Sequence, residues 1–531
     1  MENTSDCKIN KDKGFINGAF ALAFSAILVK ICGMFFKVPL SYILTDEGMG
    51  YFNSAYTVYS FFYILSSSGV PKAVTMLVTG LRNEGEHQAE RAFKITLSLF
   101  LKIGLISTVL FLLFASPLSI LIGNKSAVYT MIFIAPSLCL VCLSGVMRGY
   151  LNSYFALRFV AFSQLIEAGG KLVLGLVFAF VASKLEMSLP LISAFSTLGI
   201  SIGSLVSVIY LYAKAKSVNA GNKIEQKINI DRKTIRKNIF KIAIPISLSS
   251  ALLNLSGIID LALIMHRLKA SGLSDELASS LYGNYTTLAV PMLTLVVSVT
   301  TPIAIAVFPR LAEHHIRGNS RAFSRELNSS AYLMMLVSAP CFLSFLLYSE
   351  SILDILYTTE ASTVGKSMLS TLSIGVILLS LLTLFNTALE AEGRIRASVT
   401  SLIVGSIVKS ILGYILIGRY NLSILGAPIG TVISYLVSLI LSLLSLMKGG
   451  ISLSFFKTIF SPLSIASISF TLPFLFFIKS NINRSFFHDV FLLFISFFIY
   501  VTLVFLTNKG LLQRIKSNIL TKKSAKTVEK I

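Results

Sequence analysis

Long apolar runs, about fourteen of them, constrain this chain more than any other feature of its sequence. Hydrophobic residues fill 54% of the 531 positions and charged residues only 13%, whereas a soluble globular chain carries about 25% charged residues. Many runs reach the ~18–20 residues that cross a hydrocarbon core, and they do not alternate as barrel strands would. The sequence therefore predicts an all-α integral membrane protein with about 14 transmembrane helices.

The positive charges predict how these helices are oriented. If the N-terminus is cytoplasmic, most of the 46 Lys and Arg residues fall in cytoplasmic segments, as the positive-inside rule requires. Both termini are then cytoplasmic in a multi-pass protein. The first run is too long for a cleavable signal peptide, and Lys30 interrupts it. The predicted spans are 16–42, 50–80, 92–116, 127–147, 156–182, 189–213, 238–266, 281–309, 327–348, 367–390, 397–417, 427–447, 458–478 and 487–507.

The net charge of +22 raises the question of nucleic-acid binding. Most of the excess lies in the segment 214–237 and in the tail after Lys509. Such clusters beside membrane helices are typical of topology determinants at an anionic leaflet, and no soluble domain is present to form a nucleic-acid surface. We therefore expect no nucleic-acid partner. No metal-binding or cofactor motif is found, and Cys139 and Cys142 lie inside an apolar run, where packing explains them.

An internal duplication defines the organisation of the chain. It relates predicted helices 4–6 to helices 10–12, and both halves cross the membrane an even number of times, so they should be related by a pseudo-twofold axis along the membrane normal. The matching pairs are Arg158/Arg396, Ser163/Ser401, Lys171/Lys409 and Gly175/Gly413, each 238 positions apart, and Gly199/Gly430, Leu205/Leu436, Val206/Val437, Ser207/Ser438 and Ile209/Ile440, each 231 positions apart.

The repeat predicts the domain boundaries and the class of mechanism. We expect a six-helix lobe at 1–213, a basic cytoplasmic linker at 214–237, a second six-helix lobe at 238–447, two extra helices at 448–507 and a basic cytoplasmic tail at 508–531. Duplicated membrane bundles are typical of alternating-access transporters, whose substrate path lies between the halves.

Lysines inside the predicted spans are the main candidates for a substrate site. A lysine at mid-bilayer costs roughly 2.5–3.5 kcal/mol, so such residues usually face a cavity or a partner. Lys30 and Lys37 are seven positions apart and share a helix face. Lys171 and Lys409 are the repeat-related pair, and Lys72 follows an interruption of the second helix. We expect these five to line a central cationic cavity for an anionic or phosphorylated substrate.

Other interpretations of these charges stay open. Lys37 and Lys72 could extend to the membrane interface. Glu167 lies four positions before Lys171 and could form a structural pair with it. Asp260 is the one acidic residue deep in the second lobe, and it is either the site of a coupling ion or the partner of an intramembrane lysine.

Glycines and prolines mark close contacts and interruptions. Small-xxx-small spacings at Gly14/Gly18, Gly199/Gly203 and Gly426/Gly430 predict close helix packing. The segments 66–72 and 300–302, each ending in or containing proline, predict matching helix breaks in the two halves.

Together these features resemble the multidrug/oligosaccharidyl-lipid/polysaccharide (MOP) exporter superfamily. The resemblance is to its polysaccharide-exporter branch, which contains the stage V sporulation protein B group and the lipid II flippases. It covers nearly the whole chain and rests on the twelve-plus-two helix pattern and on the segments Ser68-Gly69-Val70-Pro71-Lys72-Ala73-Val74, Ile259-Asp260, Gly272-Leu273-Ser274, Leu281-Tyr282-Gly283-Asn284-Tyr285 and Glu390-Ala391-Glu392-Gly393-Arg394.

The resemblance implies a V-shaped pair of lobes, with the two extra helices forming a groove for a lipid tail. It also implies that basic residues of helices 1, 2 and 8 hold a pyrophosphate. Lys30 and Lys37 match the two helix 1 positions, with Lys in place of Arg, which removes the bidentate fork. Lys72 matches helix 2 only loosely, and no basic residue stands near Thr286 in helix 8.

The expected function is that of a flippase in the bacterial cytoplasmic membrane. Its substrate would be a polyprenyl-pyrophosphate-linked glycan, either lipid II or a related polysaccharide intermediate, used for cell-wall or spore-cortex synthesis. Membrane lipids and a coupling ion (Na+ or H+), or the membrane potential, would be its other partners. The alternative is a cation-coupled multidrug antiporter of the same superfamily. An enzyme is not expected, because the longest external loop, 349–366, offers only Glu350, Asp354 and Glu360.

Overall fold

Helices account for all the regular structure that the computed structural model describes, which covers residues 3–82, 85–218, 231–357, 359–417, 422–454, 456–479 and 486–507. No strand occurs in these ranges, and the predicted all-α class is confirmed. Twelve described segments are long and apolar enough to cross a membrane. One of them, Phe24–Arg82, covers the predicted span 50–80 and most of the span 16–42, and helix α8 (Arg232–Ala270) is not among the twelve. The predicted number of 14 spans therefore stays a prediction.

The helices divide into two units with dense internal packing. The first comprises Met1–Thr287 with Gly413–Ile424, and the second comprises Leu288–Leu412 with Leu425–Ile531. The predicted lobe boundary at 214–237 differs from this division because α8 and α9 pack on α1, and α8 also packs on α2. The lobes of the sequence repeat stay a prediction.

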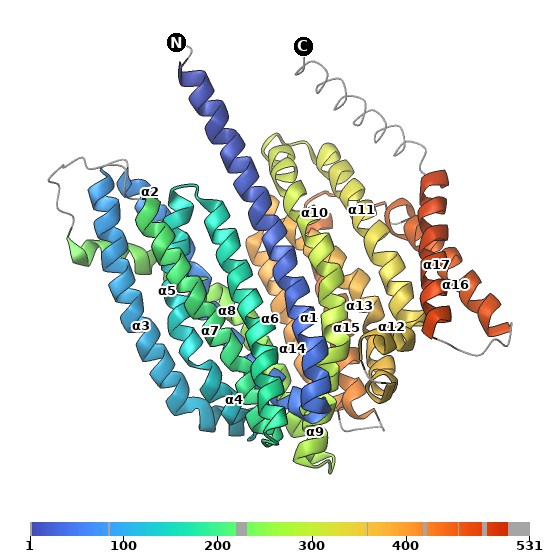
Figure 1. Ribbon diagram of the computed structural model, residues 1–531. Helices are drawn as coiled ribbons and strands as arrows, with labels where there is room; N and C mark the ends of the chain where they lie inside the picture. Colours follow the sequence, from blue (N-terminus) through green and yellow to red (C-terminus); the bar gives the residue numbers. More distant parts are fainter. Residues whose placement is uncertain are drawn as a thin grey trace. The chain divides into compact units, whose positions relative to one another are not determined.

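In the first unit, long helices run alongside one another (Figure 1). Its helices are α1 (Asn3–Ser67), α2 (Gly69–Arg82), α3 (Glu86–Leu121), α4 (Ala127–Ile134), α5 (Pro136–Ser153), α6 (Leu157–Lys184), α7 (Leu189–Val218), α8 (Arg232–Ala270) and α9 (Asp275–Asn284).

Two interruptions in the first unit shape its N-terminal helices. Thr45 has φ 58° and ψ 179°, so α1 is two helices joined at a kink, which corresponds to the first two predicted spans. The chain leaves helical geometry again at Ser68, and α2 begins at Gly69 with Pro71 in its first turn. Proline is tolerated there because the first-turn amides have no partner within the helix. The predicted break within residues 66–72 is therefore confirmed.

The break predicted at residues 300–302 is wrong. Helix α10 (Val290–Ile316) continues through Pro302, as membrane helices can when nearby hydroxyl groups bond to the backbone. Thr301 donates from Oγ1 to the Val297 carbonyl, 2.7 Å away. The interruption lies earlier instead, at a π-helical turn, η1 (Tyr285–Ala289), that joins α9 to α10.

Glycines bring α6 and α7 into backbone contact. A Cβ added at Gly199 would lie 2.1 Å from the backbone nitrogen of Gly175, and one at Gly203 would lie 3.0 Å from the Gly170 Cα. The close contact predicted at Gly199/Gly203 is therefore confirmed. The pair Gly14/Gly18 lies where the structure describes no side-chain packing, and Gly426/Gly430 is buried in α15.

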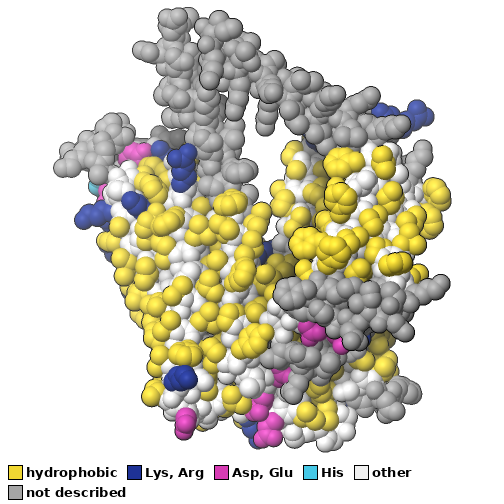
Figure 2. Space-filling model, turned by 45° about the vertical axis from the view of Figure 1, so that its right-hand side comes forward, with side chains coloured by type: hydrophobic (Ala, Val, Ile, Leu, Met, Phe, Trp, Pro, Cys, Tyr) yellow, Lys and Arg dark blue, Asp and Glu magenta, His cyan; other side chains and the backbone are white. Residues whose placement is uncertain are grey.

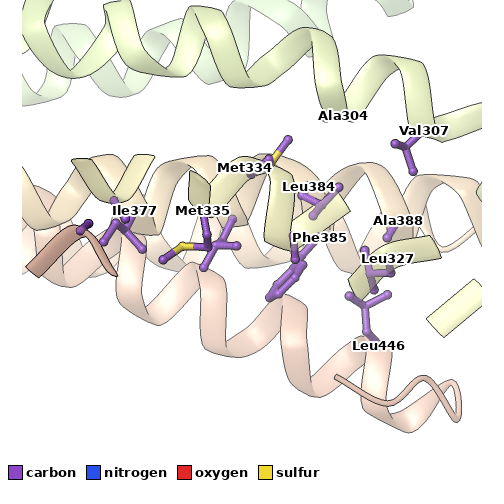
Figure 3. Packing of buried hydrophobic residues seen from close by; sticks show 14 of the residues in the cluster. Ala304, Val307, Leu327, Met334, Met335, Ile377, Leu384, Phe385, Ala388 and Leu446 are labelled. Carbon is purple, nitrogen blue, oxygen red and sulfur yellow. The ribbon is translucent and has the colours of Figure 1, made fainter. Parts of the chain in front are cut away.

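The second unit is built on its own apolar core. Figure 3 shows Met334, Met335, Leu384 and Phe385 among the side chains that fill the space between α10, α11, α13 and α15. Its other helices are α11 (Ser320–Leu347), α12 (Ser349–Leu356), α13 (Thr359–Ala391), most of α14 (Ile395–Leu416), α15 (Gly426–Lys448), α16 (Ser461–Lys479) and α17 (Phe486–Thr507), with a short π-helix η3 (Phe456–Phe460). Most of the 3-10 turn η2 (Ser423–Leu425) belongs to the first unit.

Helices α16 and α17 attach to the side of this core. They pack on each other, and α16 lies against α11. Tyr500 of α17 donates from its hydroxyl to the Leu336 carbonyl of α11, 2.9 Å away. Large apolar side chains such as Leu472, Phe494 and Phe498 are exposed on these two helices.

Exposed apolar side chains are not confined to this pair of helices. Figure 2 shows hydrophobic side chains covering the helix sides on the visible face, with most visible charged side chains toward the helix ends. Such a surface suits contact with lipid rather than water.

Candidate functional site

A cavity of about 430 Å³ lies inside the first unit, between α1, α5, α6 and α7. Its wall combines apolar and aromatic side chains with a few charged ones, which is the usual composition of a ligand pocket. The lining residues are Ala26, Val29, Lys30, Gly33, Tyr56, Tyr59, Ser60, Tyr63, Arg148, Gln164, Glu167, Ala168, Lys171 and Ile200.

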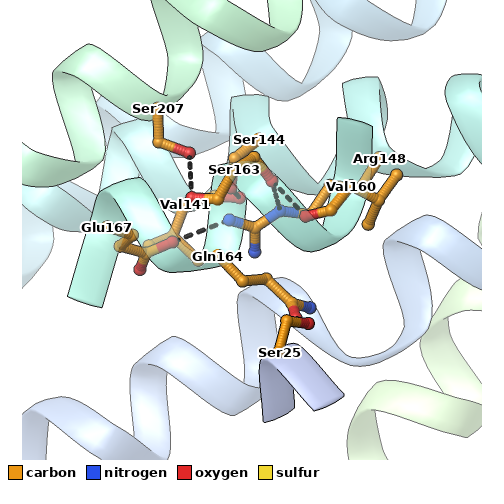
Figure 4. Close-up of polar contacts among 9 residues, drawn as sticks. All are labelled: Ser25, Val141, Ser144, Arg148, Val160, Ser163, Gln164, Glu167 and Ser207. Carbon is orange, nitrogen blue, oxygen red and sulfur yellow. Dashed lines mark hydrogen bonds and ion pairs between the residues drawn. The ribbon is translucent and has the colours of Figure 1, made fainter. Parts of the chain in front are cut away.

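An ion pair between Arg148 and Glu167 forms part of this wall. Arg148 of α5 donates from Nη2 to Glu167 Oε2 of α6 at 2.8 Å and from Nε to Ser163 Oγ at 3.1 Å. The two side chains are only 11% and 18% exposed. Figure 4 shows the guanidinium between these partners, with Gln164 beside it bonded to Ser25 of α1. The pair thus joins α5 to α6 at the cavity.

Two of the predicted lysines meet at this cavity. Lys30 of α1 is exposed and lines it, and Lys171 of α6 is half-buried on the same wall. The Lys171 ammonium lies 4.3 Å from the ring centroid of Tyr56 and 5.1 Å from that of Phe36, within the range of cation–π attraction.

Among the described residues, Glu167 does not form the alternative ion pair with Lys171. The Glu167 carboxylate binds Arg148 instead, because the guanidinium reaches it from α5, while the aromatic rings hold the Lys171 ammonium.

Lys37 takes a different place. Its ammonium donates to Asn53 Oδ1 at 2.9 Å and to the Thr286 carbonyl at 3.1 Å. Asn53 in turn donates to Thr287 Oγ1 at 2.8 Å. Lys37 therefore binds the second half of α1 and the turn η1, and it is not among the cavity-lining residues. Both bonds lie inside the first unit, and the position of this ammonium relative to the membrane interface stays a prediction.

The remaining predicted residues lie apart from the cavity wall. Lys72 is exposed in the first turn of α2, and Asp260 is half-buried in α8. Lys409 is half-buried in α14, in the part of that helix that belongs to the second unit. Their roles in substrate or ion binding stay predictions.

Sequence reasoning missed Arg148. The fourth span was predicted to end at 147, so Arg148 counted as a loop residue, whereas α5 runs on to Ser153. A signal was nevertheless present. Glu167 is the only acidic residue in the run 156–182, and a buried carboxylate needs a cationic or hydrogen-bonding partner.

The sequence repeat is visible in the hydrogen bonds of each unit. Ser207 donates from Oγ to the Ser163 carbonyl at 3.0 Å, and the repeat-related Ser438 donates to the Ser401 carbonyl at 2.9 Å. The charges, however, are not repeated. Arg148 corresponds to Asn386 (238 positions on), whose side-chain carbonyl accepts from Ser442 at 2.8 Å.

The carboxylate is missing from the second copy as well. The position that corresponds to Glu167 is Gly405. A Cβ there would lie 1.9 Å from Ser438 Oγ, so the second unit packs this place without any side chain. The ion pair thus belongs to one copy of the repeat only.

A comparison with protein families identifies the chain. The family model described as polysaccharide biosynthesis protein matches residues 15–315, more than half of the chain. The chain belongs to this family. A second model, MatE, matches residues 245–415.

Curated relatives agree with the family. Stage V sporulation protein B of Bacillus subtilis (strain 168) is 22% identical over 423 residues, which cover 79% of this chain and 80% of that protein. Lipid II flippase MurJ of the same organism is 23% identical over 447 residues, covering 80% and 81%. The predicted membership of the polysaccharide-exporter branch of the MOP superfamily is confirmed, and with it a multi-pass protein of the cytoplasmic membrane.

Solved structures show the same fold. A structure of lipid II flippase MurJ in an inward closed conformation matches with a TM-score of 0.64 at 14% identity, covering 92% of this chain and 99% of that one. An inward-facing multidrug resistance MATE family transporter of the MOP superfamily matches with a TM-score of 0.61 at 14% identity, covering 80% and 98%. These proteins are transporters by name, as predicted for this family member.

Proposed function

We propose that this protein is a flippase that moves a polyprenyl-pyrophosphate-linked glycan, lipid II or a related polysaccharide intermediate, across the cytoplasmic membrane. The observation that carries the proposal is the charged wall of the cavity in the first unit. Lys30, Arg148 and Lys171 provide three positive charges there, and Glu167 provides one negative charge. The names of the relatives, a lipid II flippase and a sporulation protein, support this substrate class.

The excess of positive charge favours an anionic ligand. Two unit charges 4 Å apart attract each other by about 4 kcal/mol at the effective dielectric constant near a protein surface. A pyrophosphate group carries the complementary charge, and tyrosines 56, 59 and 63 on the same wall offer apolar faces and hydroxyl groups for a sugar. The lipid tail would stay in the membrane against exposed apolar helix faces, for which the pair α16 and α17 is our candidate.

The energy source and the orientation belong to this proposal too. We keep Asp260 as the site for a coupling Na+ or H+, and Lys37, Lys72 and Lys409 as further contacts for the head group at other stages of transport. The membrane potential could supply about 2.3 kcal/mol per charge per 100 mV. Both termini are placed in the cytoplasm, as the positive-inside rule favours.

Alanine at either lysine of the cavity tests the proposal. We expect Lys30→Ala and Lys171→Ala to slow translocation of a lipid-linked glycan at least about tenfold, because a hydrogen bond to a charged group contributes roughly 1.5–3 kcal/mol. The measurement is the loss of a labelled lipid II from one leaflet of proteoliposomes that contain the purified protein.

A matched control is available on α3. Lys102 is also a lysine inside a membrane helix, but it is exposed and away from the cavity, so Lys102→Ala should flip at the rate of the unchanged chain. Immunoblots must show equal amounts of each variant. Translocation at full rate by both Lys30→Ala and Lys171→Ala would contradict the proposal.

The second candidate is a multidrug antiporter, favoured by the MatE match over residues 245–415. An antiporter for organic cations needs an acidic or aromatic cavity. This wall has three tyrosines, but its net positive charge repels a cation. Drug efflux in a hypersensitive strain decides between the two. Resistance conferred by the unchanged chain, without lipid II translocation, would favour the antiporter.

A further inference from the structure

We infer that Arg148 is an anion-binding residue of the cavity, and that Glu167 occupies its binding edge only while the cavity is empty. A phosphate or pyrophosphate group of the ligand takes the place of the Glu167 carboxylate on the guanidinium. The inference rests on the proposed function and deepens it, because it names the group that contacts the phosphate and the competitor that the phosphate must displace.

The second copy of the repeat provides the first argument. Its serine framework repeats that of the first copy, from Ser163 and Ser207 to Ser401 and Ser438. Asn386 then stands in place of Arg148, and Gly405 in place of Glu167. The second copy thus forms the same serine bond without either charge. Because burying charges costs desolvation free energy, a pair that the fold does not need points to a function in the first copy.

The geometry of the guanidinium provides the second argument. A guanidinium has five N–H donors in a planar fork. In Arg148, Nε is used by Ser163 and Nη2 by Glu167, and the side chain lines the cavity. A carboxylate and a phosphate present similar pairs of oxygen atoms to such a fork. Glu167 takes one bond from this fork, at Nη2, and a phosphate oxygen can accept that bond in its place.

The surrounding charges provide the third argument. Lys30 and Lys171 lie on the same wall, but an ammonium binds phosphate as a point charge without fixing its orientation. Arg148 adds the bidentate contact that a lysine-only site lacks. A displaced Glu167 carboxylate keeps its negative charge near Lys30 and Lys171. The exchange of Glu167 for the ligand therefore favours ligands with two or more negative charges over monovalent anions.

Binding of inorganic pyrophosphate to the purified full-length protein tests the inference. Isothermal titration in detergent at low ionic strength, where screening is weak, compares three forms of the chain. Relative to the unchanged chain, Arg148→Lys should bind pyrophosphate about tenfold more weakly, because the fork is lost while the charge is kept. The double variant Arg148→Asn with Glu167→Ala, which is neutral like the second copy, should lose at least as much.

The double variant should also melt within a few degrees of the unchanged chain without ligand, since it removes both charges and leaves neither of them unpaired. If it fails to fold, Arg148→Lys alone still decides the matter. Lys102→Ala serves as the control and should bind normally.

The possible results separate this inference from the proposed function. Unchanged affinity in Arg148→Lys, together with weaker binding in Lys30→Ala, would overturn the role of Arg148 and leave the cationic cavity standing. Absence of pyrophosphate binding by the unchanged chain would overturn the inference, while the lipid II translocation assay would still judge the proposed function independently.

Discussion

Gly199→Ala is expected to destabilise the first unit strongly, although it adds a single methyl group. The new Cβ would lie 2.1 Å from the backbone nitrogen of Gly175 and 2.5 Å from its Cα. Those are main-chain atoms of α6, so no side-chain rotation relieves the contact, and α6 and α7 must move apart. Overpacking typically costs 1–3 kcal/mol and occasionally more, and we expect the upper part of that range here. The measurement is thermal unfolding of the detergent-solubilised protein, followed by size-exclusion chromatography.

Gly169→Ala is the matched control on α6. No atom lies within 4 Å of a Cβ built there, and alanine favours a helix over glycine by up to about 1 kcal/mol. This variant should melt at or slightly above the temperature of the unchanged chain. Equal melting temperatures for Gly199→Ala and Gly169→Ala would show that α6 and α7 are not in backbone contact.

Glu167→Ala should reduce the stability of the protein more than any other single change at the cavity. It leaves the Arg148 guanidinium, only 11% exposed, without its carboxylate and beside the positive charges of Lys30 and Lys171. Removing one partner of a buried ion pair costs about 3–5 kcal/mol. The open cavity allows some solvation, so the lower end of that range is expected. The loss should be seen as a lower melting temperature and a lower yield of folded protein.

Adding Arg148→Asn to this variant should restore most of the loss. The uncompensated charge is then gone, and Ser163 stands at the position from which Ser401 bonds to Asn386 in the second unit. A double-mutant cycle of the melting data measures the coupling between the two positions. If the two substitutions lower stability additively, the ion pair does not operate as the structure places it.

Much of the fold follows from local pattern. The apolar runs predict the helices because a membrane leaves the backbone few alternatives, and Gly199 with Gly203 predicts a close contact because small side chains permit one. The interruption of the eighth predicted span, 281–309, was harder to predict. Pro302 suggested a break at residues 300–302, but α10 continues through that proline. The helix instead has a π-helical turn at η1, and the residues Tyr285–Ala289 include neither proline nor glycine.

The cavity was predictable in part. Lys30 and Lys171 were expected to share a site because lysines inside apolar runs need a polar environment, and both line the cavity. Arg148 was missed because the predicted span ended at 147, one residue before it and six residues before the end of α5. Lys37 was expected in the cavity, but its partners include Thr286, 249 positions away. Helical periodicity describes one helix at a time, so it cannot reveal a bond of that kind.

The turn η1 has a mechanical consequence. The chain passes from one unit to the other within these five residues, and π-helical turns are common sites of helix kinks. The chain also crosses between the units within α14 and at the end of η2, so η1 is one of three crossings. The Lys37 ammonium donates a hydrogen bond to the Thr286 carbonyl in this turn. A substitution that removes this ammonium would therefore remove a side-chain restraint on the backbone of η1.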